Sequence, residues 1–521
     1  MKDVRVRFAP SPTGPLHMGG VRTALYNWLF ARAHGGTFIL RVEDTDQGRF
    51  VDGAEAYIEE ALSWCGLTPD EGVQAGGDCG PYRQSERTAL YQDAVQALLD
   101  RGLAYEAFDT PDELNELRKA AEPDVWQYDA TTRGGLRNRL ALGADKVAQL
   151  KADGVPFVVR FKTPESDEAV VFEDAIRGEV SFQTAVLDDK VLMKADGLPT
   201  YHLANVVDDH HMRISHVIRG EEWLPSAPLH VLLYRAFDWD HPVFAHLPLI
   251  LKPTGNGKLS KRDGDAGGFP VFPTNWTDPK SGDTWPGYRE QGYAPEAFVN
   301  MLLMLGWNPG DERELFTADE AAKEFSLDRV VKSGARFNPD KAKWFQEQHL
   351  RGADPETHLA ALQQLAADKG LGWDKAACTQ VLDMMLERVA FLQDIVDTAW
   401  LHAAPAAFNA KLVKKKWKDQ TSGYLEDLAS ELEALDDAAL LGDLEDLEGA
   451  VGDRLVHGLD ERRRHVAHAV QTSLGRSEPD LAAGLVGVAH QYGGQDAVRR
   501  RVRLQSTTGV DGQQLRAHDL V

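Results

Sequence analysis

The first 70 residues alternate between two patterns of apolar and polar positions. Residues 4–8 place apolar side chains at every second position, and residues 37–42 form a short, mainly apolar run. Both patterns are typical of β-strands. Between them, after a turn rich in proline and glycine, residues 21–33 carry the apolar spacing of an amphipathic helix. This order predicts βαβ units and therefore a parallel sheet with helices on both faces.

The same alternation returns further along the chain. Residues from about 105 to 190 are more mixed, and we interpret them as an insertion. Beyond them, helical patterns cover residues 201–209 and 225–237, and strand patterns cover residues 214–219 and 243–246. The sequence therefore predicts an α/β domain in two halves, with a second domain inserted between them.

The pattern changes again after residue 262. Residues 263–292 are rich in Gly, Pro, Asp and Trp, which predicts a loop, either a mobile one or an insertion found in only part of a family. From residue 294 onward helical spacing dominates, so the last third of the chain is expected to be all-α. The predicted boundaries give five segments, 1–104, 105–195, 196–262, 263–335 and 336–521.

Length and composition narrow the class of protein. A chain of 521 residues is expected to form three to four domains, at roughly 150 residues each. No apolar run approaches the roughly 20 residues that cross a bilayer, and the N-terminus has no signal-peptide pattern. Three scattered cysteines, Cys65, Cys79 and Cys378, are too few for a disulfide framework or a structural zinc site. We therefore expect a cytoplasmic protein with no membrane partner.

The net charge of −24 argues at first against a nucleic-acid partner, because phosphate contacts need Lys and Arg. The charge is uneven, however. Residues 421–450 contain ten acidic residues and no basic one, whereas residues 411–418, 462–464 and 499–501 are basic runs. Local basic faces on an acidic protein are compatible with tRNA binding, and solvated helix faces are the alternative for each run.

One candidate motif for chemistry joins the first strand to the first helix. Residues 10–20 contain turn residues, then His17, Gly19 and Gly20. Glycines at a helix start let a phosphate approach exposed N–H groups, and His17 would donate a hydrogen bond to a phosphate oxygen. Taken alone, so short a pattern is better explained as an ordinary strand–turn–helix with an incidental histidine.

The second candidate motif is the basic run Lys258-Leu259-Ser260-Lys261-Arg262, which follows a flexible loop. Three cations in five residues can neutralise a triphosphate and can stabilise the charge as it shifts onto the departing pyrophosphate. Taken alone, it fits a basic surface loop equally well. The order of the two motifs and their separation of about 240 residues match the two signatures of class I aminoacyl-tRNA synthetases.

Further segments make the resemblance specific. Bacterial glutamyl-tRNA synthetases are similar to this chain from residue 4 to about residue 417, including an insertion near 264–290 found in part of the family. The segments that carry the similarity are residues 7–14 (RFAPSPTG), 41–46 (RVEDTD), 80–87 (GPYRQSER), 201–209 (YHLANVVDD) and 217–223 (VIRGEEW).

The resemblance implies both a fold and a reaction. The fold would be a Rossmann-like parallel-sheet catalytic domain with an inserted α+β acceptor-stem domain, then a stem-contact helical domain and all-α anticodon-binding domains. The reaction would activate L-glutamate with ATP and Mg²⁺ and transfer it to the 3′ end of tRNA(Glu), with tRNA(Gln) as a second acceptor left open. The enzyme is expected to be a monomer that binds no zinc.

The resemblance also implies roles for single residues. Arginine binds carboxylates in a planar, bidentate way, and Arg7 and Arg219 end strands whose carboxyl ends face the crevice of such a sheet. The glutamate-binding residues would be Arg7, Ala9, Ser11, Glu43, Tyr201, Asn205 and Arg219. The catalytic residues would be His17, Gly19, Lys258, Ser260, Lys261 and Arg262, and those at ATP would be Thr13, Gly14, His17, Gly20, Glu222, Leu251, Lys258 and Lys261.

Some alternatives stay open at this point. Arg7 and Glu43 could pair only with each other across adjacent strands. His210 and His211 lie beside two aspartates but lack a three-ligand set, so a structural or tRNA-adjacent role is favoured over a metal site.

Three rival functions are an adenylyltransferase or ligase for small molecules, a tRNA-modifying paralogue and a non-catalytic RNA-binding protein. The helical last third argues against the first two, and the retained pair of motifs argues against the third. Beyond about residue 446 the family pattern fades, so the anticodon contacts stay open.

Overall fold

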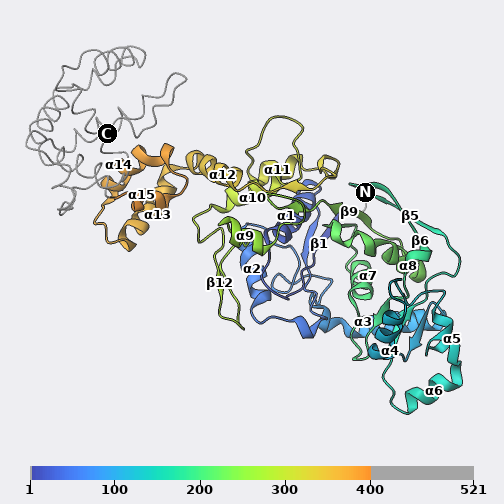
Figure 1. Ribbon diagram of the computed structural model, residues 1–521. Helices are drawn as coiled ribbons and strands as arrows, with labels where there is room; N and C mark the ends of the chain where they lie inside the picture. The colour runs from blue at the N-terminus through green and yellow to red at the C-terminus, as the bar shows by residue number, and fades with distance from the viewer. Residues whose placement is uncertain (1–2, 400–521) are drawn as a thin grey trace, which may run out of the picture. The chain divides into compact units, whose positions relative to one another are not determined.

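The computed structural model describes residues 3–399 (Figure 1). Its contacts divide the chain into two compact units, Met1–His349 and Leu350–Val521. The basic and acidic runs after residue 410, and the departure from the family pattern after residue 446, lie outside the described residues.

The first unit begins with the predicted βαβ arrangement. Strand β1 (Arg5–Phe8) pairs in parallel with β2 (Thr37–Leu40), and α1 (Met18–Ala33) connects them and lies alongside β1 (Figure 1). Eleven of the 16 residues of α1 are buried, because the helix also packs against α10 (Pro295–Met304) and α11 (Ala318–Glu324). The strand–helix–strand prediction is confirmed, and α1 is a core helix rather than a surface one.

A four-stranded sheet in the order β6-β5-β9-β8 forms the second part of this unit. Strands β8 (His216–Gly220) and β9 (Val243–Leu247) are parallel, and helices α7 (Tyr201–His211) and α8 (Ala227–Phe237) belong to the same core. Strand β5 (Ala169–Asp174) is parallel to β9 but antiparallel to β6 (Gly178–Gln183). The sheet is thus mixed, since the three residues between β5 and β6 permit only an antiparallel return.

Ser215, just before β8, ties this sheet to β1. The amide of Ser215 donates to the Arg5 carbonyl at 2.9 Å, and its hydroxyl accepts from the Arg5 amide at 2.8 Å. Strands β1 and β8 therefore start together and run to the same end.

The stretch interpreted as an insertion contains its own antiparallel sheet. Strand β4 (Val158–Phe161) lies between β3 (Ala104–Ala107) and β7 (Val191–Met193). Its helices are α4 (Pro111–Ala120), α5 (Arg139–Leu142) and α6 (Ala144–Ala152), while α2 (Ala54–Trp64) and α3 (Thr88–Asp100) precede it. Because β5 and β6 also fall within it, this stretch contributes two strands to the four-stranded sheet.

Residues 263–292 are mostly irregular, as their composition predicted, but they also contain regular elements. They include most of α9 (Lys261–Gly267) and the antiparallel pair β11 (Trp276–Thr277) and β12 (Thr284–Trp285). Apolar and aromatic side chains set among the glycines and prolines anchor the segment in the main core, where Trp276 and Tyr288 are buried. Beyond it, β13 (Ala335–Arg336) pairs in parallel with β10 (Ile250–Leu251).

From Pro339 to Asp397 the described elements are helical, as the spacing predicted. Helix α12 (Pro339–Gly352) crosses the division between the units, and α13 (Pro355–Asp368), α14 (Lys375–Met385) and α15 (Leu392–Asp397) build the described core of the second. None of the helices in residues 3–399 is both long and apolar enough to cross a membrane.

Candidate active site

A cavity of about 640 Å³ opens where β1 and β8 end. The start of α1, helix α7 and the segments after β8 and β10 complete its wall. The predicted site residues that line it are Arg7, Ala9, Ser11, Thr13, His17, Gly19, Gly20, Glu43, Tyr201, Asn205, Arg219, Glu222 and Lys258. Five predicted positions do not line it, namely Gly14, Leu251, Ser260, Lys261 and Arg262.

His17 caps α1 with one ring nitrogen and leaves the other free. Its Nδ1 accepts a hydrogen bond from the Gly19 amide at 3.2 Å, while Nε2 is buried without a hydrogen-bond partner among the described residues. Burial and the nearby charge of Lys258 lower the pKa of His17 to about 4. The ring is therefore neutral at neutral pH, with its proton on Nε2, and this N–H is a donor without an acceptor.

The first turn of α1 does not offer the exposed N–H groups that the glycines suggested. The Met18 amide donates to the Val271 carbonyl at 2.9 Å, and the Gly20 amide donates to the His17 carbonyl at 2.8 Å. Together with the Gly19–His17 bond, these contacts occupy the donors of the first turn. In this structure the hydrogen-bond donor available to an anion here is the His17 side chain.

Lys258 reaches the cavity from the second motif. Its ammonium lies 2.7 Å from a carboxylate oxygen of Glu222, which is part of the 3-10 helix Glu221–Ser226 after β8. Burial raises the pKa of Glu222, but the hydrogen bond from Lys258 holds it below its ordinary value. The pair is partly exposed, so Lys258 can exchange this partner for a phosphate at low cost.

Lys261 lies elsewhere. Its ammonium is 3.0 Å from the ring centroid of Trp285 in β12, and it lines a separate hollow of about 230 Å³ together with Phe269 and Phe272. Ser260 caps α9 through a capping box with Asp263, and Arg262 is exposed. The structure therefore brings together His17 and Lys258 but not Lys261.

Buried ion pairs fix two of the predicted glutamate-binding residues. Arg7 binds Asp209 through two hydrogen bonds, at 2.9 and 3.2 Å, and Arg41 binds Asp209 at 2.7 Å and Glu43 at 3.1 Å. With its amide oxygen turned toward the arginines, Asn205 accepts from both at 3.2 Å. Arg7 and Glu43 thus have other ion-pair partners, so the alternative in which they pair only with each other does not hold.

Arg219 is surrounded by neutral acceptors instead. Its Nε donates to Nε2 of His246 at 3.1 Å, and its Nη1 donates to the Tyr201 hydroxyl at 2.8 Å. The side chain is 5% exposed and forms no ion pair with any described residue. Arg22 also lines the cavity and forms no ion pair with a described residue, but its guanidinium donates hydrogen bonds to the carbonyls of Leu305 and Pro248.

Several residues of this site escaped the sequence analysis. Asp209 had a signal, since it lies four residues after Asn205 on the same helix face, but the segment 201–209 that ends with it gave it no role. His210 stacks on Trp239 at 3.7 Å, so the structure gives it an aromatic partner. His246 and Asp174 had no local signal, because they lie 72 residues apart and meet only through sheet pairing.

Comparisons with known proteins find similar chains of one family. A family model described as the catalytic domain of class I tRNA synthetases (E and Q) matches residues 3–344. The glutamate–tRNA ligase of Phocaeicola vulgatus is 55% identical over 443 residues, covering 84% of this chain and 87% of that protein. The glutamate–tRNA ligase of Porphyromonas gingivalis is 55% identical over 437 residues, covering 83% of this chain and 86% of that protein.

Solved structures are similar as well. The crystal structure of a glutamate–tRNA ligase from Elizabethkingia meningosepticum, in complex with its amino acid, has a TM-score of 0.82 and 46% identity, covering 96% of this chain and 99% of that one. The glutamate–tRNA synthetase of Elizabethkingia anophelis has a TM-score of 0.81 at 46% identity, with the same coverage.

Proposed function

The chain belongs to the class I tRNA synthetases for glutamate and glutamine and acts as a glutamate–tRNA ligase, and on that premise we propose that the cavity between β1 and β8 is where glutamate reacts with ATP. The reaction joins the α-carboxylate of glutamate to the α-phosphate of ATP and releases pyrophosphate. It needs positioning and charge stabilisation rather than a protein nucleophile. The cavity supplies donors and cations suited to both.

At the phosphate end, His17 and Lys258 are the residues that stabilise charge. The neutral His17 ring donates from Nε2 to a phosphate oxygen, and Lys258 leaves Glu222 to neutralise the triphosphate. Mg²⁺ enters as part of the MgATP substrate. Lys261 joins the site only after leaving the Trp285 ring.

At the amino-acid end, Arg219 binds a substrate carboxylate. Glu43 accepts from the α-ammonium, assisted by Ser11 and the backbone at Ala9. Arg7 is already neutralised by Asp209, so it contributes hydrogen bonds and shape more than net charge. The observation that carries this proposal is the buried cation of Arg219, whose hydrogen-bond acceptors among the described residues are neutral, because a buried cation without a direct ion-pair partner is costly unless an anion joins it.

Replacing Arg219 with lysine tests this assignment. Lysine keeps the charge but loses the planar fork, so Arg219→Lys should raise the KM for glutamate by about 10- to 100-fold, the equivalent of a lost charged hydrogen bond. The KM for ATP should change by less than about twofold, because Arg219 does not contact the nucleotide in this proposal. Both constants come from glutamate-dependent pyrophosphate exchange in the presence of tRNA.

Arg101→Lys is the matched control, since Arg101 is a half-exposed arginine that pairs with Asp238 on the surface. It should leave both constants unchanged. An unchanged KM for glutamate in Arg219→Lys would remove Arg219 from the substrate site.

For the RNA, we propose tRNA(Glu) as the acceptor, with charging of tRNA(Gln) decided by assay. The region with the β3-β4-β7 sheet would receive the acceptor stem, and the helices after Pro339 would start the anticodon-binding part. A monomer in the cytoplasm is the arrangement we expect, as in the sequence-based prediction.

A further inference from the structure

Three neighbouring strands place three polar side chains in a row, and the row starts at the wall of the cavity. Arg219 on β8 lies directly opposite His246 on β9 in the parallel register. Asp174, the last residue of β5, pairs with Phe244 of β9, two residues before His246. Residues two apart on a strand share a face, so sheet register alone aligns Asp174, His246 and Arg219.

The hydrogen bonds along this row fix the tautomer of His246. Its Nδ1 lies 2.6 Å from Oδ2 of Asp174, and its Nε2 accepts from Arg219 Nε at 3.1 Å. Because the guanidinium can only donate, Nε2 carries no proton, and the proton of the neutral ring is on Nδ1. Burial and the charge of Arg219 lower the pKa of His246, although Asp174 opposes them, so the ring stays neutral.

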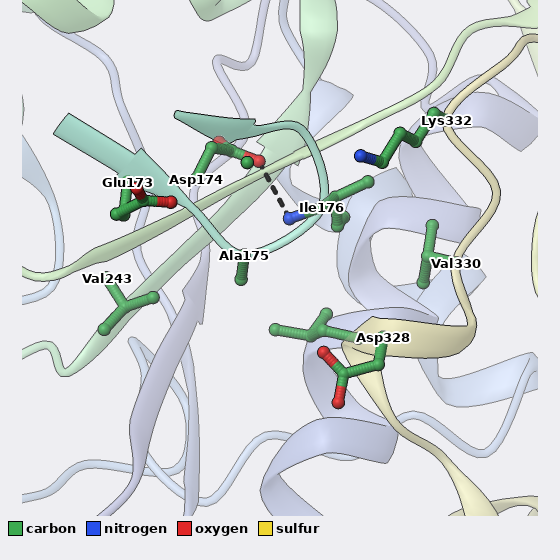
Figure 2. Close-up of a pocket in the computed structure, with 10 residues that line it drawn as sticks. Glu173, Asp174, Ala175, Ile176, Val243, Asp328, Val330 and Lys332 are labelled. Carbon is green, nitrogen blue, oxygen red and sulfur yellow. Dashed lines mark hydrogen bonds between the residues drawn. The ribbon is translucent and has the colours of Figure 1, made fainter. Parts of the chain in front are cut away.

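Asp174 is itself held from several sides. Its Oδ1 accepts from the amides of Ile176 at 3.0 Å and Arg177 at 2.9 Å, and Figure 2 shows the carboxylate turned toward Ile176. The His246 amide adds a further donor, at 3.2 Å from Oδ2. Asp174 is 2% exposed although it borders a hollow of about 430 Å³, whose wall also carries Glu173, Asp328 and Lys332 (Figure 2).

The other charged group in contact with His246 is Arg177, whose Nε donates to the His246 carbonyl at 3.3 Å. Its Nη2 pairs with Glu221, so its charge is already compensated. Arg219 is therefore the cation beside His246 that forms no direct ion pair with a described residue.

We propose that Asp174 and His246 are positioning residues for glutamate: they hold the Arg219 guanidinium through a neutral acceptor, so that its geometry is fixed while its charge is left for a substrate carboxylate. This inference rests on the proposed role of Arg219 in binding glutamate. A carboxylate in the place of His246 would fix the guanidinium equally well but would neutralise it, as Asp209 does for Arg7. Asp174 acts through His246, because it keeps the acceptor nitrogen of His246 turned toward Arg219.

Two amide replacements of His246 separate this role from general packing. In His246→Gln the side-chain oxygen can reach the position of Nε2 and accept from Arg219. In His246→Asn the shorter amide reaches only the Nδ1 position and leaves Arg219 Nε without an acceptor. Both variants are neutral and polar, so they form a matched pair.

The expected result is a KM for glutamate within about threefold of the wild type for His246→Gln, and a rise of about 10-fold or more for His246→Asn, as for a lost charged hydrogen bond. Asp174→Asn should raise the KM for glutamate as His246→Asn does. The NH₂ group of asparagine can only donate, so it cannot replace a carboxylate oxygen that accepts from the donors around Asp174. The KM for ATP should stay within about twofold in all three variants. The assay is glutamate-dependent pyrophosphate exchange with tRNA, on full-length protein that keeps the wild-type circular-dichroism spectrum.

Equal KM values for the Gln and Asn variants of His246, or an unchanged KM in Asp174→Asn, would overturn the inference. Measuring Arg219→Lys in the same assay separates a failure of the positioning role from a failure of the proposed glutamate site. If Arg219→Lys raises the KM for glutamate while the His246 pair does not differ, only the positioning role fails. If Arg219→Lys has no effect, the proposed glutamate site itself fails.

Discussion

At the scale of single residues, His17 combines two roles in one ring. Its Nδ1 accepts a hydrogen bond from the Gly19 amide as the cap of α1, and its Nε2–H has no acceptor among the described residues, so we propose that it serves the nucleotide. The depressed pKa, about 4, means that the ring does not gain charge as the pH falls through the ordinary range of histidine titration. Because the cap uses Nδ1 as an acceptor, the proton of the neutral ring is fixed on Nε2.

Asparagine at position 17 should separate these roles. Its side-chain oxygen can keep the cap, since Asn is a preferred N-cap residue, but it has no donor at the Nε2 position. His17→Asn should therefore lower kcat by about 100- to 1000-fold, as for other lost transition-state donors. The free energy of unfolding should change by less than about 1 kcal/mol. Pyrophosphate exchange and chemical denaturation measure the two effects.

His17→Ala is the companion variant, because it removes both the cap and the donor. It should lose the same activity and about 1 kcal/mol of stability in addition. A stable His17→Asn protein with wild-type kcat would show that Nε2 does not serve the reaction.

Sequence reasoning reached half of the residues that line the cavity but few of their partners. Arg7, His17, Glu43 and Arg219 were found because they sit in recognisable motifs. Arg7 and Arg219, however, have their partners far away in the sequence: Asp209 pairs with Arg7, and Asp174 acts on Arg219 through His246. Charge compensation therefore could not be predicted from the motifs alone.

At the scale of elements, the segment after the second motif packs against the start of α1, next to the site. The Val271 carbonyl bonds to the first residue of α1, and the Phe272 ring meets His17 edge-on at 6.1 Å. Composition predicted a loop for residues 263–292, because Gly, Pro and Asp are frequent there. Most of the segment is irregular, as predicted, but composition does not show that the aromatic residues in it would pack into the core.

The same segment holds Lys261 away from the cavity through Trp285. If Lys261 must leave this ring to reach the triphosphate, then Trp285→Leu should lower the KM for ATP. A cation–π contact of about 0.5–2 kcal/mol corresponds to a decrease of roughly 2- to 30-fold. The KM for glutamate should not change. Initial rates of pyrophosphate exchange against ATP concentration measure the effect.

Trp126→Leu serves as the control, because Trp126 is a partly buried tryptophan that packs with Tyr128 in another part of the unit. It should leave the KM for ATP unchanged. A KM for ATP that rises or stays constant in Trp285→Leu would mean that Lys261 works from its position on the ring or does not contact ATP.

At the scale of the whole molecule, the parallel pairing of β1 with β2 could be predicted, but the pairing within the four-stranded sheet could not. Residues 201–209 were expected to be helical, and α7 spans Tyr201–His211. The antiparallel return of β6 and its place at the edge of the β8-β9 sheet depend on contacts between distant segments, which periodicity does not contain. For the same reason the alignment of Asp174, His246 and Arg219 could not be predicted, because it depends on how these strands pair.

The central claim is that this chain activates glutamate in the cavity between β1 and β8 and transfers it to tRNA. The most direct measurement is aminoacylation of tRNA(Glu) and tRNA(Gln) with radiolabelled glutamate or glutamine, using wild-type protein and Arg219→Lys in parallel. We predict that glutamate is attached to tRNA(Glu), that glutamine is attached to neither tRNA, and that the variant recovers charging only at about 10- to 100-fold higher glutamate. Charging of neither tRNA, or glutamine charging by the wild type, would contradict the account.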